Sequence, residues 1–144
     1  MRLTDIDITR FGFFENQKLA NLPEGLLIIE GANEAGKSTL LAFLRECLFG
    51  FHDGRKTDRI ASPGGKPGGR LGLRMADGRA FWLDRAGTGR DAAAIRGRDG
   101  APTPPTQDPA QLLGGITRDL FEQVYAFSLA EFQQMGALES AELQ

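Results

Sequence analysis

The chain has 144 residues, enough for one domain with a hydrophobic core of ordinary size. Hydrophobic residues make up 41% of it and charged residues 25%, as in soluble globular domains, which argues against a disordered or fibrous chain. No apolar run approaches the roughly 20 residues that cross a bilayer, and Asp5 and Asp7 interrupt the place where a signal peptide would be apolar. Cys47 is the one cysteine, so no internal disulfide can form, and we predict a cytoplasmic protein without a membrane segment.

The formal net charge of −2 hides an uneven distribution of charge along the chain. The segment from Arg55 to Arg98 holds eleven basic and four acidic residues. Such a segment can face DNA or another polyanion. Alternatively, its arginines alternate along strands and cover a solvated sheet face, and we favour this second interpretation.

The first 30 residues contain two strand patterns and a weaker third. Apolar and polar residues alternate from Thr4 to Thr9, which predicts a half-buried strand. A turn at residues 11–14 leads to a weaker strand from Lys18 to Leu22. After a Pro-Glu-Gly turn, the continuous apolar run Leu26–Ile29 predicts a strand that is covered on both faces.

The next segment predicts a helix and then hairpins. Apolar residues recur three and four positions apart up to Leu48, which predicts an amphipathic helix that ends near Gly50 and buries the Cys47 thiol. Residues 53–69 are rich in glycine and proline and predict a surface loop. Alternation then resumes, and Asp77-Gly78 predicts a hairpin whose returning strand spans residues 80–84. Asp99-Gly100 can close another hairpin.

The last third of the chain predicts a linker and short helices. Residues 101–109 are rich in proline, and Asp108-Pro109 is a suitable start for a short helix. Thr117 can cap a helix that runs through Tyr125. Ser128 and Glu131 form a capping box, which predicts one more helix.

The sequence Gly31-Ala32-Asn33-Glu34-Ala35-Gly36-Lys37-Ser38 matches the phosphate-binding P-loop pattern at every fixed position. Glycines allow backbone amides to approach phosphate oxygens, and the helix that follows directs its positive dipole end to the same anion. Lys37 would bring a full charge to the β- and γ-phosphates, and the Ser38 hydroxyl would ligate Mg²⁺. The sequence therefore predicts a site for a nucleoside triphosphate, MgATP above all.

Hydrolysis also requires an acidic residue that holds the metal, on a strand beside the P-loop. Asp84 ends an apolar strand, but that strand returns from a hairpin and so belongs to an antiparallel meander. Two alternatives stay open on these grounds. One is a stand-alone kinase or GTPase that uses Asp84, and the other is a non-enzymatic interaction module whose fold the nucleotide orders.

Several segments together resemble the start of SMC-like ABC ATPases, a group that includes the RecF and SbcC types, and above all the YhaN-type bacterial proteins. The segments are Met1-Arg2-Leu3, Arg10-Phe11-Gly12, residues 26–43 with the P-loop, Leu48–Phe51, and residues 117–131. This resemblance implies an α/β fold, the P-loop N-terminal lobe of an ABC/SMC-type head, with an antiparallel β-meander and C-terminal helices. Its parts would be residues 1–52, 53–100 and 101–144.

The resemblance also implies roles for individual residues. Residues Asn33, Glu34, Ala35, Gly36, Lys37, Ser38 and Thr39 would wrap the phosphates together with Gly31. The loop from Phe11 to Phe14, which includes Gly12, would lie near the base or ribose. A glutamine loop, which senses Mg²⁺ and the attacking water, would include Ser128, Gln133 or Gln134.

The resemblance implies partners as well. Such heads continue into a coiled coil and a second lobe that carries the remaining catalytic motifs, and two heads dimerise in DNA repair or chromosome transactions. We find none of those motifs here, so we expect an incomplete head that binds MgATP, hydrolyses it negligibly and exposes apolar surface toward the missing lobe.

Overall fold

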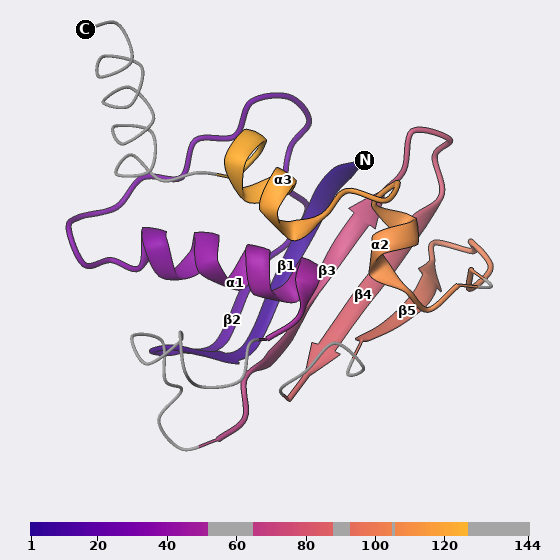
Figure 1. Cartoon of the computed structure of the whole chain (residues 1–144). Coiled ribbons are helices and arrows are strands. Elements are labelled where there is room, and N and C mark those ends of the chain that lie inside the picture. Colours follow the sequence, from indigo (N-terminus) through magenta and orange to yellow (C-terminus); the bar gives the residue numbers. More distant parts are fainter. Residues whose placement is uncertain (52–64, 88–92, 105, 127–144) are drawn as a thin grey trace, which may run out of the picture.

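The computed structural model describes residues 1–51, 65–87, 93–104 and 106–126 (Figure 1). Five strands form one antiparallel sheet in the order β2-β1-β3-β4-β5. The strands are β1 (Arg2–Phe11), β2 (Phe14–Leu19), β3 (Gly68–Arg74), β4 (Ala80–Ala86) and β5 (Ala93–Arg98). The mixed α/β class and the antiparallel meander expected from the sequence are confirmed.

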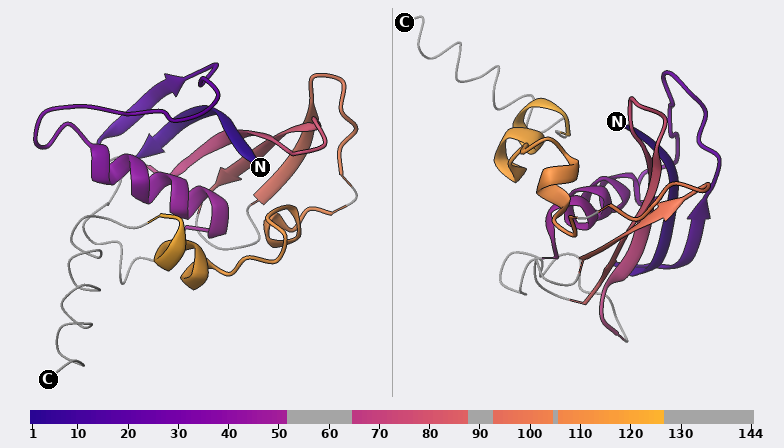
Figure 2. Two further views of the ribbon diagram at one scale, coloured as in Figure 1. Left: turned by 90° about the horizontal axis from the view of Figure 1, so that it is seen from above. Right: turned by 90° about the vertical axis from the view of Figure 1, so that its right-hand side faces the viewer.

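Three helices lie on the same side of this sheet, as the two views of Figure 2 show. Helix α1 (Lys37–Phe49) packs across the sheet. The short helices α2 (Pro109–Leu112) and α3 (Arg118–Val124) pack against α1. The sheet therefore has one face covered by helices and one bare face, as far as the described residues go.

The core lies between α1 and the covered sheet face. Strand alternation places every second residue on this face, so an apolar/polar repeat suffices to bury one side. The helix contributes Phe43 and Cys47, both fully buried. The strands contribute the side chains of Ile6, Ile8, Leu71, Leu73, Phe81, Leu83 and Ile95.

Alternate strand positions on the bare face carry charge, and four arginines there each meet a carboxylate. The pairs are Arg70–Asp7, Arg74–Asp99, Arg96–Asp84 and Arg98–Asp5. The guanidinium groups of Arg70 and Arg98 also lie 4.3 and 4.4 Å from the ring centroid of Trp82. For these arginines the structure supports the second of our two interpretations, a solvated sheet face rather than a polyanion surface.

The predicted local signals at the helix ends and turns are confirmed. The Asp108 side chain accepts a hydrogen bond from the Ala110 amide at 2.9 Å, and α2 begins at Pro109. Thr117 caps α3, accepting from the Leu120 amide at 3.3 Å. Asp77-Gly78 turns between β3 and β4 as expected. The capping box at Ser128 lies outside the described residues.

Two strand predictions fail. The weaker second strand begins earlier than predicted, at Phe14, and ends at Leu19. Residues Leu26–Ile29 form no strand and pair with none of the five strands of the described sheet. Their side chains are 88, 40, 69 and 45% exposed in chain order. An apolar run predicts burial only where a partner strand and a second layer exist, and the described part of the chain supplies neither.

The turn at Asp99-Gly100 forms, but no strand returns from it. The extended chain after it covers the outer edge of β5 instead. The side-chain amide of Gln107 accepts a hydrogen bond from the Ile95 N–H at 2.8 Å and donates one to the Ile95 carbonyl at 3.3 Å, as the backbone of a neighbouring strand would. The Thr103 hydroxyl accepts from the Gly97 N–H at 3.3 Å. This edge of the sheet is thereby protected from pairing with another chain.

Candidate phosphate-binding site

The P-loop sequence lies between the exposed segment Leu26–Ile29 and the start of α1. Residues 33 and 34 form a turn that the Ala35 amide closes by donating to the Ala32 carbonyl at 3.2 Å. The helix then begins at Lys37, after Gly36 in a left-handed conformation with φ of 98°. Gly36 supplies no side-chain cap, so the first amides of α1 are left for an external acceptor.

The ammonium group of Lys37 lies over the loop that precedes it. Nζ donates to the carbonyl oxygens of Gly31 at 2.5 Å and Ala32 at 2.8 Å. These contacts use two of the three N–H groups and hold the exposed side chain across the loop. The third N–H and the full charge can meet an anion at the N-terminus of the helix.

Position 36 requires glycine because of the neighbouring side chains as well as because of its backbone conformation. A Cβ atom built there would lie 2.5 Å from the Phe13 ring and 2.6 Å from the Phe14 ring. The rings of Phe13 and Phe14 pack on each other with centroids 4.6 Å apart. The turn between β1 and β2 therefore lies directly against the loop.

The same packing corrects the role expected of Phe11. Its side chain is only 3% exposed and contacts the rings of Phe43 and Phe51 in the core. Phe11 therefore cannot stack on a base from this position. Phe13, which is 62% exposed beside the loop, is the aromatic residue that can. Gly12, with φ of 57°, makes the turn that carries Phe13 there.

The remaining loop residues lie mostly at the surface. Asn33, Glu34, Ala35 and Ser38 are exposed, and Thr39 is half-buried in the first turn of α1. The Ser38 hydroxyl is thus accessible at the helix start. The Lys37 ammonium, the first amides of α1 and the Ser38 hydroxyl together fit a triphosphate with its Mg²⁺.

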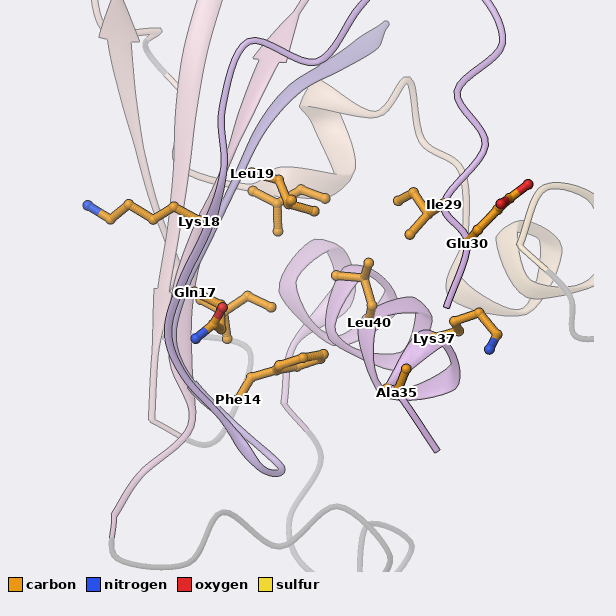
Figure 3. A pocket seen from close by; sticks show the side chains of 12 residues that line it. Phe14, Gln17, Lys18, Leu19, Ile29, Glu30, Ala35, Lys37 and Leu40 are labelled. Carbon is orange, nitrogen blue, oxygen red and sulfur yellow. The ribbon is translucent and has the colours of Figure 1, made fainter. Parts of the chain in front are cut away.

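A hollow of about 170 Å³ lies on the inner side of the loop, between β2, α1 and the chain at Ile29 (Figure 3). Figure 3 shows Phe14, Leu19 and Leu40 around this space, while Lys18 points away from it. Its lining is mainly apolar, so it suits an apolar side chain rather than phosphates. A second, open depression beside the loop is lined by Ile29, Glu30, Gly31 and Lys37.

Asp84 does not lie at this site. Its register with Arg70 and Ala94 puts it on the bare sheet face, opposite α1, where its carboxylate binds Arg96 at 2.9 Å. Ser128, Gln133 and Gln134 lie outside the described residues. Among the residues that the structure describes, no three His, Cys, Asp or Glu side chains gather as metal ligands.

Two arginines that sequence reasoning did not single out hold the other end of α1. The buried Arg85 donates to the carbonyls of Cys47 at 2.7 Å and Leu48 at 3.2 Å. Arg118 donates to the Gly50 carbonyl at 3.3 Å and to the buried Glu46 carboxylate at 2.6 Å. The alternation of β4 could have predicted that Arg85 is buried, because Phe81, Leu83 and Arg85 occupy alternate positions and so share the core face.

Burial affects two titratable groups at this end of the helix. It raises the pKa of the Cys47 thiol to about 12, although nearby Arg85 counteracts it. Burial also lowers the pKa of Arg85, against the opposing effect of Cys47 and Glu46, but an arginine stays charged in a protein. The prediction that the Cys47 thiol is buried is confirmed.

A P-loop sequence thus precedes a helix that packs on one face of an antiparallel sheet. The chain belongs to the AAA domain family, whose sequence model matches residues 1–139. A similar protein is the "Uncharacterized protein YhaN" of Bacillus subtilis (strain 168), which is 26% identical over 137 residues. The resemblance to YhaN-type proteins is thus confirmed.

The aligned residues are 95% of this chain but 14% of that relative. No solved structure matches the chain. Family membership and similarity support a nucleotide-binding role of the ATPase type. None of the helices in the described ranges is long and apolar enough to cross a membrane.

Proposed function

We propose that this chain is the ATP-binding N-terminal lobe of an SMC- or YhaN-like ATPase head. The observation that carries the proposal is the exposed Lys37 ammonium, held across the loop at 2.5 and 2.8 Å from two carbonyls. It lies at the N-terminus of α1, where the uncapped amides attract an anion. A cation and a helix terminus that share one exposed loop are suited to a triphosphate.

Each group of the loop has a distinct task in this proposal. The amides around Gly36 and the Lys37 ammonium bind the β- and γ-phosphates, and the Ser38 hydroxyl ligates Mg²⁺. When bound, Mg²⁺ neutralises charge on the phosphate oxygens. Phe13 offers its exposed ring to the base.

The exposed run Leu26–Ile29 supports the partner part of the proposal. In the complete protein this segment becomes a strand when it pairs with strands of a second lobe, which also carries the groups for hydrolysis. The 144 residues alone then bind MgATP and hydrolyse it negligibly. Complete heads dimerise on ATP and act in DNA repair or chromosome transactions in the cytoplasm.

Titration calorimetry of the Lys37→Ala variant tests nucleotide binding directly. A hydrogen bond from a charged donor is worth about 1.5–3 kcal/mol, so the Kd for MgATP should rise at least about tenfold. Lys18→Ala is the matched control, because Lys18 pairs with Asp7 at 3.4 Å and points away from the loop. Equal affinity of Lys37→Ala and the wild type would remove the P-loop from the proposal.

The alternatives are not favoured by any contact in the described structure. A stand-alone kinase or GTPase would need Asp84 beside the P-loop, but Asp84 binds Arg96 on the opposite face. The second alternative, a non-enzymatic module whose fold the nucleotide orders, would use the same binding site. It differs from the proposed function in having no part in hydrolysis. ATPase activity of the full-length protein that is lost in Lys37→Ala and kept in Asp84→Ala separates the proposed function from both.

A further inference from the structure

We infer that Arg118 and Arg45 latch helix α3 to helix α1, and that Arg118 is a positioning residue for the ATPase reaction. The inference rests on the proposed function. In this arrangement the chain that leaves α3 at Ala126 is held at a fixed place relative to the phosphate-binding loop. The P-loop helix and α3 then respond to nucleotide as one rigid body.

The first part of the latch is the Arg118 guanidinium, which contacts three groups. It binds Glu46 of α1 at 2.6 Å, the Gly50 carbonyl after α1 at 3.3 Å, and Glu122 within α3 at 2.7 Å. The side chains of Arg118 and Glu46 are 22% and 8% exposed, so water screens their attraction only partly. Burial lowers the pKa of Arg118, but the carboxylates of Glu46 and Glu122 outweigh it and raise the pKa.

The second part joins α3 and the residues just after it to the C-terminal half of α1. Arg45 donates from Nη2 to the Ala126 carbonyl, and the rings of Phe49 and Phe121 pack with centroids 5.1 Å apart. Contacts from Arg45, Glu46 and Phe49 thus come from consecutive turns of α1. Figure 1 shows α3 alongside this half of the helix.

The latch and the phosphate site lie on the same helix. Arg45 is eight residues after Lys37, which is about 12 Å along a helix. The Ala126 carbonyl is anchored there, and the chain beyond it includes the predicted glutamine-loop residues. A break in the Arg118–Glu46 pair would free this anchor without touching a phosphate-binding group.

The test uses the full-length protein that contains this chain and compares two substitutions around one arginine. Glu46→Gln breaks the cross-helix ion pair, whereas Glu122→Gln breaks only the pair within α3. We expect Glu46→Gln to lower kcat for ATP hydrolysis about tenfold and to leave the Kd for ATP within about twofold of wild type. Glu122→Gln should leave kcat within about twofold.

Hydrogen exchange gives a readout that does not depend on hydrolysis. The amides of Tyr125 and Ala126 both donate to the Phe121 carbonyl, at 2.9 Å each. In the nucleotide-free protein they should exchange at least about tenfold faster in Glu46→Gln than in Glu122→Gln. Arg118→Lys, which keeps the charge, should restore part of the protection that Arg118→Met loses.

Unchanged kcat per folded molecule in Glu46→Gln, with unchanged exchange at Tyr125 and Ala126, would overturn the inference. A higher Kd for ATP together with a lower kcat would overturn it too, because the Arg118–Glu46 pair would then support the P-loop itself. If Glu46→Gln does not fold, Arg118→Lys against Arg118→Met decides on the same two measurements. Failure of the wild type to bind ATP would refute the proposed function instead and is seen before any variant is made.

Discussion

At the scale of single residues, Glu34 has the most strained backbone conformation in the described part of the chain. Four non-glycine residues there have positive φ, and three of them are Asn or Asp, which tolerate that region. Glu34 is the fourth, with φ of 66° in the turn of the P-loop. An L-residue with a long side chain pays about 1–2 kcal/mol for this conformation. The loop therefore stores strain at the phosphate site.

Glu34→Gly should relieve the strain and also remove a carboxylate beside the site. Because glycine is more flexible in the unfolded chain, we expect a net gain of about 0.5–1 kcal/mol in the free energy of unfolding. Urea unfolding measures the gain, and titration with MgATP should show tighter binding. Glu34→Ala is the control, because it removes the charge and keeps the strain. Equal stability of the Gly and Ala variants would show that the loop is not strained there.

At the scale of elements, the C-terminal end of α1 is completed by groups from elsewhere in the chain. The last carbonyls of any helix lack internal partners, and α1 has no basic residue in its last turn. Arg85 of β4 and Arg118 of α3 supply the missing donors. Cations at a C-terminus also complement the helix dipole. The helix is thereby tied both to the sheet and to α3.

Replacing Arg85 by Met should remove the hydrogen bonds that join the end of α1 to β4. Two hydrogen bonds to the Cys47 and Leu48 carbonyls would be lost, and the buried carbonyls would be left without these donors. We expect the free energy of unfolding to fall by about 2–4 kcal/mol, as measured by urea unfolding. Arg96→Met should cost about 0.5 kcal/mol or less, because its ion pair with Asp84 is 64% exposed on the arginine side. A similar small loss for Arg85→Met would refute the capping role.

The same elements show what the sequence alone can predict. Caps at Asp108 and Thr117, the Asp77-Gly78 turn and the strand alternation depend on neighbours in the chain, and all are found. The contacts of Arg85 and Arg118 with α1 join residues 38 and 72 positions apart. No local pattern encodes such pairings. The position of the P-loop lysine was predictable, but the burial of Phe11 and exposure of Phe13 depend on how the β1–β2 turn packs.

At the scale of the whole molecule, the described chain is a sheet with one helical layer and an apolar segment left in solvent. Leu26 and Ile28 are 88% and 69% exposed, and Ile29 of the same segment lines the mainly apolar hollow of Figure 3. Monomeric proteins seldom expose adjacent large apolar side chains in this way. The sequence pattern predicted a strand covered on both faces, and the described residues provide neither the strand nor the cover.

The isolated 144-residue chain should therefore self-associate through this segment. We expect its apparent mass in sedimentation velocity to rise with concentration, because an extended apolar run with unpaired backbone groups can pair with another copy. Leu26→Asp combined with Ile28→Asp should hold the chain at the monomer mass. Leu120→Asp is the matched control, since Leu120 is 47% exposed on α3, and it should leave the association unchanged. A chain that stays monomeric at high concentration would contradict the need for a second lobe, because its apolar segment would then be stable in water.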